Sequence, residues 1–268
     1  MNTYIGFIGA GNMGGAIARS VAKAGYSKSI ILCDKDESKA KTLADELGAT
    51  SGTSEQVTKK CDVIFLGVKP QLLSATVEEL APFLEKREKK PLFISMAAGV
   101  SLEKLKKLLG ESTPVIRIMP NTPVSVGEGM ILWCADENVS DEQKALFLAI
   151  SEKAGTLDQI DETLIDAASA VSGCGPAFVY MFIEALADGG VKCGLPRDRA
   201  LLYAEQTLLG ASKLALTSGA HPGELKDAVC SPAGSTIEGV RKLENGAMRS
   251  SVIEAVSASY ERTKALGK

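Results

Sequence analysis

The stretch Tyr4-Ile-Gly-Phe-Ile-Gly-Ala-Gly-Asn-Met-Gly-Gly-Ala-Ile-Ala18 decides the fold of this chain. Residues 4–8 form a short apolar run that is typical of a buried strand. Gly9, Gly11 and Gly14 then match the spacing G-x-G-x-x-G, and small apolar residues follow at helical spacing. This order of strand, glycine turn and helix predicts a nucleotide site, because the N-terminus of a helix favours phosphate groups.

Each glycine of the turn has its own expected role. Gly9 permits the tight turn, Gly11 lets the backbone approach a pyrophosphate, and Gly14 lets helix and strand pack closely. The alternative is a glycine turn with a purely structural role. We expect cofactor contacts along the whole turn, at Gly9, Ala10, Gly11, Asn12, Met13 and Gly14.

Length, composition and charge narrow the class of protein. The chain has 268 residues, of which 45% are hydrophobic and 24% charged, which suits a globular protein of two domains. The net charge of −3 argues against nucleic acid or an anionic membrane as a partner. No apolar run approaches the length of a membrane helix, and no leader precedes the first strand. We therefore expect a cytoplasmic protein with no nucleic-acid and no membrane partner.

The six cysteines do not form a metal-binding motif. None is spaced as C-x-x-C, and the single histidine, His221, completes no zinc motif with a neighbouring cysteine. We expect no metal site, and small buried or half-buried thiols in a reducing compartment. The cysteines are Cys33, Cys61, Cys134, Cys174, Cys193 and Cys230.

Strands and helices alternate over residues 1–160. Beyond the first strand and helix, we expect strands at 29–33, 61–67, 91–95, 114–118, 126–133 and 155–160, and helices at 36–47, 72–84, 101–109 and 141–153. The strand at 61–67 is apolar on both faces, as in the interior of a parallel sheet. This order predicts an α/β fold with a Rossmann-like, doubly wound sheet as the dinucleotide-binding domain.

Three further loops follow the carboxyl ends of these strands, where ligands bind in open α/β sheets. They contain Val68-Lys69-Pro70, Ala97-Ala98-Gly99 and Asn121. We expect all three to meet the edge of the sheet that the glycine turn marks, and to contribute to the cofactor site.

Asp34, at the end of the second strand, bears on the choice of cofactor. An acidic residue there usually binds the ribose hydroxyls of NAD and repels the 2′-phosphate of NADP. Lys35, Lys39 and Lys41 follow and could hold that phosphate. Asp34 could instead cap the next helix. The residues alone leave NADH and NADPH both open.

The second half, residues 161–268, is predicted to be entirely helical. The expected helices are 164–171, 176–193, 197–217, 223–229 and 236–260. Tyr180, Glu184 and Asp188 share one helix face. The two carboxylates could serve acid–base chemistry, although such residues more often form ion pairs or face solvent.

The segment before the last helix is unusual. Ser231, Ser235 and Thr236 gather hydroxyl groups and free N–H groups around Gly234. Such a group suits a small carboxylate. An elaborate N-cap, with Ser235 or Thr236 bonding the first turn, explains the segment equally well.

Eight motifs, taken in order, resemble the pyrroline-5-carboxylate reductase family over nearly the whole chain. They are Phe7-Ile-Gly-Ala-Gly11, Leu66-Gly-Val-Lys-Pro70, Met119-Pro-Asn-Thr-Pro123, Ser172-Gly-Cys-Gly-Pro-Ala177, Ala187-Asp-Gly-Gly-Val191, Gly194-Leu-Pro196, His221-Pro-Gly-Glu-Leu-Lys-Asp227 and Ser231-Pro-Ala-Gly-Ser-Thr-Ile237. The last of these is close to the signature of the family.

The resemblance implies reduction of 1-pyrroline-5-carboxylate to L-proline by NADPH or NADH. It implies that residues 9–14, 68–70 and 97–99 line the cofactor site. It also implies that the backbone of residues 234–236 holds the substrate carboxylate, with Ser231 nearby, and that Thr236 contacts the ring nitrogen. The family forms a homodimer through C-terminal helices, often assembled into a decamer.

Two departures and two alternatives stand beside this resemblance. Ala233 replaces a glycine that family members often carry, and Asp34 stands where many relatives have a small or polar residue suited to NADPH. A β-hydroxyacid dehydrogenase would need a lysine one turn into the helix after Ser172-Gly, and none is present. A non-catalytic NAD(P)-sensing regulator would need no carboxylate site. We expect His221 to cap or pack rather than to act as a base.

Overall fold

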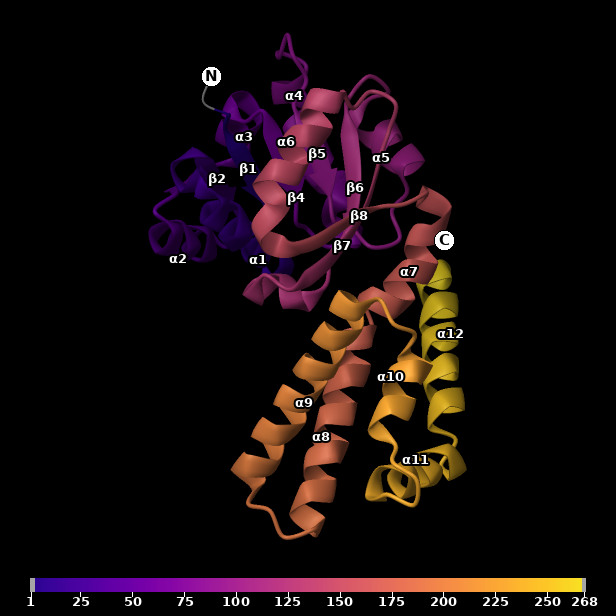
Figure 1. The fold of residues 1–268 in the computed structure, drawn as a ribbon. Coiled ribbons are helices and arrows are strands. Elements are labelled where there is room, and N and C mark those ends of the chain that lie inside the picture. The colour runs from indigo at the N-terminus through magenta and orange to yellow at the C-terminus, as the bar shows by residue number, and fades with distance from the viewer. Residues whose placement is uncertain (1–2, 267–268) are drawn as a thin grey trace. The chain divides into compact units, whose positions relative to one another are not determined.

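The computed structural model describes residues 3–266, and its first half contains an eight-stranded sheet with the order β3-β2-β1-β4-β5-β6-β7-β8 (Figure 1). The strands are β1 (Ile5–Ile8), β2 (Ile30–Cys33), β3 (Thr50–Ser51), β4 (Val63–Leu66), β5 (Leu92–Ser95), β6 (Val115–Met119), β7 (Gly129–Ala135) and β8 (Gly155–Gln159). All neighbours are parallel except β6 and β7, which are antiparallel. The predicted α/β sheet is confirmed.

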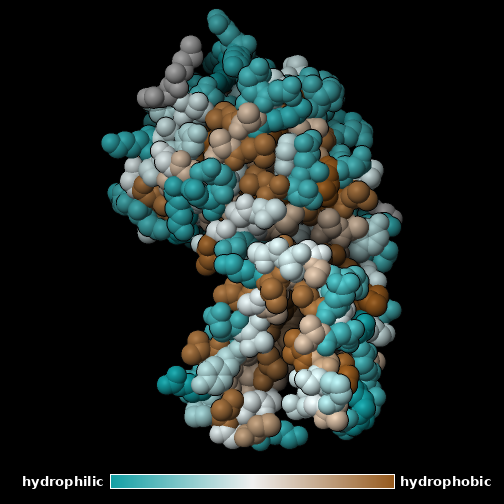
Figure 2. Space-filling view, in the orientation of Figure 1, coloured by the Kyte–Doolittle hydropathy of each residue, from teal (hydrophilic) through white to brown (hydrophobic). Residues whose placement is uncertain are grey.

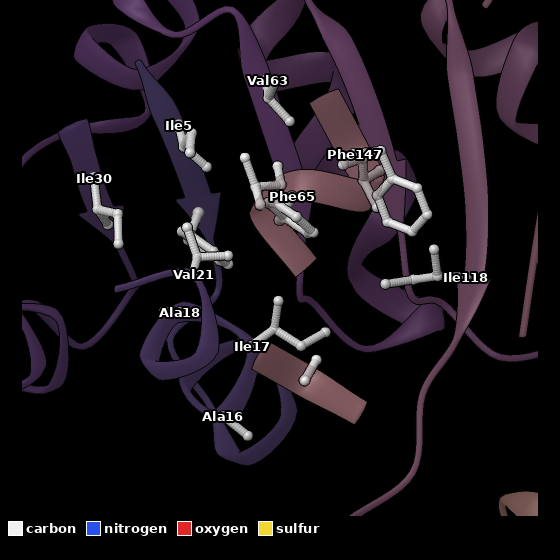
Figure 3. Close-up of a cluster of buried hydrophobic side chains, with 14 of the residues drawn as sticks. Ile5, Ala16, Ile17, Ala18, Val21, Ile30, Val63, Phe65, Ile118 and Phe147 are labelled. Atoms are coloured by element: carbon white, nitrogen blue, oxygen red, sulfur yellow. The ribbon is translucent and has the colours of Figure 1, made fainter. Parts of the chain in front are cut away.

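Six helices cover the two faces of the sheet. They are α1 (Asn12–Val21), α2 (Glu37–Leu47), α3 (Ser54–Lys60), α4 (Leu73–Leu84), α5 (Leu102–Leu109) and α6 (Asp141–Ser151). On one face, Ile17 of α1, Leu43 of α2 and Phe147 of α6 pack on the sheet; Figure 3 shows Ile17 and Phe147 among the strand residues. On the other face, Val57, Leu80 and Leu105 come from α3, α4 and α5. The sheet is therefore doubly wound.

Two features of the sheet differ from the expectation. The two-residue strand β3 extends the sheet beyond β2 and was missed, because two exposed polar residues carry no apolar pattern. The strand expected at 126–133 begins at Gly129 and continues to Ala135, and residues 122–126 form a 3₁₀ turn instead. This turn reverses the chain, so β7 runs against β6.

A short helix, α7 (Ile165–Ser172), packs on the sheet through Ile165, which lies in a buried cluster with Met119, Leu132 and Cys134. The remaining helices are α8 (Gly175–Lys192), α9 (Arg197–Ser218), α10 (Pro222–Val229), α11 (Ser235–Asn245) and α12 (Met248–Leu266). The predicted all-helical second half is thus confirmed.

The single helix expected at 236–260 is wrong. The chain forms α11 and α12, separated at Gly246 and Ala247, and α12 continues to Leu266. Ala247 adopts a left-handed conformation with φ of 54°. A right-handed α-helix needs a negative φ, so the helix cannot continue through this residue. The pair Asn245-Gly246 is the turn signal that could have revealed this break.

Contacts divide the chain into two units. The sheet unit comprises the chain up to Cys174 together with the end of α12 from Ser259, and the helical unit comprises Gly175–Ala258. The expected boundary after residue 160 stays a prediction.

The helical unit buries few of its own side chains. Among its residues, only Ala187, Ala200 and Ala204 are buried, where α8 and α9 pack together. Large apolar side chains remain exposed on its helices, as the brown surface in Figure 2 shows. They include Tyr180, Met181, Leu186, Leu202, Leu209, Leu214, Leu216 and Ile253.

One helical stretch among the described residues, Glu162–Lys192, has the length and composition of a membrane span. This differs from the expectation that no apolar run approaches the length of a membrane helix, because the stretch includes both α7 and α8. Length and composition alone are weak support for a membrane span, since core helices of other proteins share them.

Candidate active site

The glycine turn lies between the carboxyl ends of β1, β2 and β4. Gly9 has φ of 101°, which fits the expected tight turn. Its N–H donates to Cys33 O at 2.8 Å, and the N–H of Gly67 donates to Ile8 O at 2.8 Å. The turn is therefore bonded to the end of β2, and the residue after β4 is bonded to the end of β1.

Three glycines approach one another too closely for side chains. A Cβ atom on Gly14 would lie 2.1 Å from Gly9 O, and one on Gly67 would lie 2.7 Å from the same oxygen. The expected close packing at Gly14 is confirmed. Gly67 was read only as the end of a strand, and the sequence offers no signal that it contacts the glycine turn.

The surroundings of Gly11 are open. A Cβ atom there would meet nothing within 4 Å, so a ligand can reach the backbone. Gly11 is the N-cap of α1, without a side-chain hydrogen bond, and no acidic residue lies in the first turn. The first bond of the helix runs from Gly15 N to Gly11 O, so the N–H groups of residues 12–14 have no partner within it. These features fit a pyrophosphate.

Asp34 bonds to the backbone of the glycine turn. Its Oδ2 accepts from the N–H of Ala10 at 2.7 Å, and its Oδ1 accepts from the N–H of Asp36 at 3.0 Å. The N-cap of α2 is Asp36, which accepts from Ser38 N, so the capping role considered for Asp34 belongs to its neighbour. Both carboxylate oxygens of Asp34 thus hold the β2–α2 loop and the glycine turn together.

A shallow pocket lies beside Ala10, between α1 and α2. It is lined by Ala10, Arg19, Ser38, Lys39, Thr42, Leu43 and Glu46. Of the three lysines considered for a 2′-phosphate, only Lys39 lines it. Lys41 points to Asp45, with 3.2 Å between Nζ and Oδ2. Arg19 is held by Glu46 through two bonds of 2.7 Å.

Two of the other loops continue the same edge of the sheet. Lys69 precedes a short 3₁₀ turn that begins at Pro70, and Val68 is half-buried. The N–H of Met96 bonds to Leu66 O at 3.3 Å, which places the loop after β5 next to the end of β4. In that loop Ala97 is buried, Ala98 is exposed, and Gly99 has φ of 72°.

The side chain of Asn121 is engaged within the protein. Its Oδ1 accepts from Met130 N at 2.9 Å, and its Nδ2 donates to Ser172 O at 2.9 Å. Asn121 therefore connects the loop after β6 to the end of α7. Any contact that it makes with a cofactor would come from its backbone or from rearrangement of these bonds.

The strand that precedes this loop, β6, carries a buried ion pair that no sequence pattern indicated. The guanidinium of Arg117, in β6, donates to Glu162 at 2.9 Å and to Asp166 at 3.1 Å, and its side chain is only 5% exposed. Glu162 also accepts from Leu102 N at 2.7 Å. These bonds tie α7 and α5 to the sheet.

In the helical unit, residues 231–234 form a closed turn that is followed by α11. The N–H of Gly234 donates to Ser231 O at 3.0 Å, and α11 begins at Ser235 without a side-chain cap. The alternative of an elaborate N-cap by Ser235 or Thr236 therefore has no bond to support it. Within residues 3–266, the N–H groups of Ser235, Thr236 and Ile237 have no acceptor, so they are the donors that remain for a carboxylate.

The other polar residues singled out in this unit have ordinary structural surroundings. His221 is the N-cap of α10, where its Nδ1 accepts from Gly223 N at 3.0 Å, as expected for a capping residue. Asp188 pairs with Arg197 at 2.6 Å. Tyr180 and Glu184 are exposed.

All six cysteines are free thiols. Burial raises the pKa of Cys33 to about 11 and of Cys61 and Cys134 to about 12, so these thiols stay protonated near neutral pH. Cys193 is exposed, which differs from the expected burial. Within the part of the chain that the structure describes, no three His, Cys, Asp or Glu side chains are placed to hold a metal ion.

Comparison with known proteins supplies the family. Residues 162–266 match the model described as pyrroline-5-carboxylate reductase dimerisation, and residues 4–99 match that of NADP oxidoreductase, coenzyme F420-dependent. A pyrroline-5-carboxylate reductase of Methanosarcina acetivorans is 42% identical over 100% of this chain and 99% of its own length. The chain belongs to the pyrroline-5-carboxylate reductase family.

Relatives in this family support the assignment over the whole chain. The pyrroline-5-carboxylate reductase of Escherichia coli K12 is 40% identical, with both chains covered completely. A structure of the Coxiella burnetii enzyme has a TM-score of 0.91 at 34% identity, with full coverage of both chains. The Plasmodium falciparum enzyme, solved with NADP bound, has a TM-score of 0.87 at 33% identity and covers 100% of this chain and 99% of its own. Membership of this family excludes a β-hydroxyacid dehydrogenase as the chain's family.

Proposed function

We propose that this chain reduces 1-pyrroline-5-carboxylate to L-proline with NADPH as the hydride donor. The observation that carries the proposal is full-length identity of about 40% to pyrroline-5-carboxylate reductases. A bound nicotinamide supplies the hydride, which goes to the imine carbon while a proton goes to the ring nitrogen. A protonated cyclic imine accepts hydride readily, so the protein's main task is positioning.

The cofactor is proposed to bind along the edge formed by the glycine turn and three strand ends. The open backbone at Gly11 and the free N–H groups of α1 suit its pyrophosphate. Residues 68–70, 97–99 and the backbone of Asn121 are proposed to line the nicotinamide half. The glycine contacts at Gly9, Gly14 and Gly67 keep this edge free of side chains.

The substrate is proposed to bind at the turn that precedes α11. The N–H groups of Ser235 and Thr236, reinforced by the dipole of α11, would hold the carboxylate. The bond from Gly234 N to Ser231 O fixes the turn. Ser231 and Gly234 are therefore proposed to shape the site without donating to the carboxylate themselves. The hydroxyl of Thr236 is proposed to orient the ring nitrogen, and no general base is required.

NADPH is proposed as the preferred cofactor, because both carboxylate oxygens of Asp34 already accept backbone N–H groups. Two of its four lone-pair sites are therefore already used, and its charge is partly compensated, which weakens its repulsion of a 2′-phosphate. Lys39 lines the adjacent pocket and is proposed to bind the 2′-phosphate. Lys35 is proposed to contribute to the potential around this phosphate.

The helical unit is proposed to form a homodimer, further assembled into a decamer. Residues 162–266 match the dimerisation model, and the exposed apolar side chains of the helical unit need a cover. The same cover explains the apolar stretch Glu162–Lys192 without a membrane. We propose a cytoplasmic enzyme with a dinucleotide-binding domain at 1–160 and a substrate and dimerisation domain at 161–268.

The cofactor proposal is tested by kinetics with NADPH and NADH side by side. We expect kcat/KM to favour NADPH by at least about tenfold, roughly 1.4 kcal/mol. Lys39→Gln should raise KM for NADPH about tenfold and leave KM for NADH unchanged. Lys41→Gln, in which the lysine lies outside the pocket, is the matched control. Equal use of the two cofactors, or equal effects of the two variants, would contradict the proposal.

The substrate proposal is tested with Thr236→Ala. We expect kcat/KM for pyrroline-5-carboxylate to fall about 10- to 100-fold, which corresponds to about 1.4–2.7 kcal/mol of lost transition-state stabilisation. KM for NADPH should stay constant. Thr217→Ala removes a hydroxyl that bonds to Lys213 O in α9 and serves as the control. If neither cofactor is oxidised when the substrate is added to the wild-type protein, the proposed reaction is wrong.

A further inference from the structure

The pocket between α1 and α2 adjoins the place where a cofactor ribose binds. In dinucleotide-binding sheets the ribose lies against the acidic residue at the end of the second strand, which is Asp34 here. Asp34 Oδ2 accepts from Ala10 N at 2.7 Å, and Ala10 also lines the pocket. The pocket has a volume of about 240 Å³, which leaves room for a phosphate group. A phosphate on the 2′ oxygen of that ribose would therefore enter the pocket.

Arg19 reaches into the same pocket from α1. A Cβ atom on Gly15, one turn before Arg19, would lie 3.3 Å from Arg19 Nη1 and 3.5 Å from Ala10 O. The missing side chain at Gly15 thus leaves the space in which Nη1 lies beside the glycine turn. Although Arg19 lies about two turns into α1, its guanidinium is close to the expected position of the ribose.

Glu46 orients this guanidinium. Nε and Nη2 of Arg19 donate to the two carboxylate oxygens of Glu46, each at 2.7 Å, and two such bonds fix the guanidinium plane. The hydrogen bonds from Arg19 hold the pKa of Glu46 below its ordinary value, so the carboxylate is charged near neutral pH. Within residues 3–266, Nη1 has no acceptor, so its two N–H groups remain for a ligand.

The ion pair is not needed to hold α1 against α2. Ile17 of α1 and Leu43 of α2 already belong to one buried cluster. The side chains of Arg19 and Glu46 are 41% and 47% exposed, and ion pairs with such exposure contribute little to stability. The two bonds of the pair therefore call for an explanation other than the packing of the two helices.

The other side of the pocket carries groups that complement Arg19. Lys39 and the hydroxyl-bearing Thr42 line it from α2. An arginine, a lysine and a hydroxyl that surround one pocket are donors typical of a phosphate site. Glu46 is the one carboxylate among the lining residues, and both of its oxygens already accept from Arg19.

We infer that Arg19 is a second residue that determines cofactor choice, because its Nη1 binds the 2′-phosphate of NADPH from the α1 side of the pocket. Lys39 binds the same phosphate from the α2 side. Glu46 is a positioning residue that orients Arg19 and also reduces the positive charge of the pocket. The inference rests on the proposed function, since it takes this pocket as the site of the 2′-phosphate.

The test measures Kd by calorimetry for NADPH, for NADH and for 2′,5′-ADP, which carries the 2′-phosphate without a nicotinamide. We expect Arg19→Gln to raise Kd for NADPH and 2′,5′-ADP about 3- to 10-fold, and to change Kd for NADH by less than about twofold. The Kd for NADPH should also rise less steeply with salt in this variant than in the wild type. Lys41→Gln removes a cation outside the pocket and is the control.

Glu46→Gln is expected to shift the same Kd in the opposite direction. The amide oxygen still accepts one bond from Arg19, whereas the negative charge leaves the pocket. Kd for 2′,5′-ADP should fall about 3- to 5-fold, and Kd for NADH should stay constant. Asp45→Asn is the matched control, because Asp45 pairs with Lys41 at 3.2 Å outside the pocket and loses the same charge. This control should change each Kd by less than about twofold.

All four variants alter exposed ion pairs, so each should melt within a few degrees of the wild type. An unchanged Kd for 2′,5′-ADP in Arg19→Gln would overturn the inference. Equal shifts of Kd for NADPH and NADH would also overturn it, as would equal shifts in Glu46→Gln and Asp45→Asn.

The outcomes separate the inference from the proposed function. If the wild-type protein binds 2′,5′-ADP no more tightly than 5′-AMP, or if Lys39→Gln leaves both affinities unchanged, the proposed site of the 2′-phosphate is wrong. If Lys39→Gln weakens binding of 2′,5′-ADP and Arg19→Gln does not, only the role given to Arg19 is wrong.

Discussion

The sheet unit and the helical unit bury their apolar side chains to very different extents. In the sheet unit, strands such as β1 and β4 are buried along their whole length between two layers of helices. In the helical unit only Ala187, Ala200 and Ala204 are buried, although its helices carry leucine, tyrosine and methionine side chains. The first unit holds a large core, whereas the second has an extensive apolar surface and only a small buried cluster between α8 and α9.

This difference assigns separate tasks to the two units. A glycine turn that binds phosphates needs a rigid frame, and the doubly wound sheet supplies it from within one chain. Three buried alanines cannot offset the conformational entropy lost in ordering the helical unit. The proposed homodimer would supply the missing burial from a second copy, and the match of residues 162–266 to a dimerisation model supports it.

The largest effect is expected where the helical unit depends on its partner. Met181, in α8, is 70% exposed in the single chain, and Met181→Asp would place a charge in the proposed interface. We expect loss of the oligomer and a fall in melting temperature of more than about 10 °C. Each kcal/mol of lost stability lowers the melting temperature by about 2–4 °C in a chain of this size. Light scattering gives the mass.

Val126→Asp is the control, because Val126, in the sheet unit, is 71% exposed and so matches Met181 in exposure. This variant should keep the mass and melting temperature of the wild type. A Met181→Asp protein of wild-type mass would show that this face of α8 lies outside the subunit interface. The apolar side chains of the helical unit would then not be covered by a second copy at this face.

The next largest effect is expected inside the sheet unit, at the buried ion pair. Arg117→Met leaves Glu162 and Asp166 facing a buried apolar side chain, and we expect the free energy of unfolding to fall by about 3–5 kcal/mol. Arg19→Met removes a surface pair with Glu46 and should cost at most about 1 kcal/mol. Denaturant titration measures both. Equal losses of unfolding free energy in the two variants would mean that burial of Arg117 does not strengthen its contribution to stability.

A smaller but more specific effect is expected at the glycine turn. Gly14→Ala forces a Cβ atom to within 2.1 Å of Gly9 O, so we expect a stability loss of about 1–3 kcal/mol and no measurable NADPH binding. Gly11→Ala meets no atom within 4 Å and should fold normally. If the pyrophosphate lies on Gly11, the added methyl group should raise the Kd for NADPH at least about tenfold above that of the wild type. Fluorescence titration measures this Kd.

Most of the sheet could be predicted because its signals are local. The strands at β1, β4 and β5 are continuous apolar runs, and the helices between them have regular apolar spacing. The direction of β7 could not be predicted, since a strand carries the same pattern whichever way it runs. The break between α11 and α12 was missed for a different reason, because helical spacing continues on both sides of Gly246.

The site was predictable to the extent that its residues belong to motifs. Gly9 and Gly14 have the roles that their spacing suggests, and His221 caps a helix as expected. The contacts of Asp34 with Ala10, of Gly67 with Gly9 and of Arg117 with Glu162 join residues far apart in the sequence. No local pattern indicates such pairs, so they could be found only in the folded chain.

The scarcity of buried side chains in the helical unit also has a kinetic consequence. A unit whose core forms only between two chains cannot complete its folding in a step that involves one chain. Refolding should then show a fast phase for the sheet that is independent of protein concentration, followed by a second-order phase that accelerates with it. In dilute solution the active enzyme would appear slowly, long after the nucleotide-binding sheet has formed.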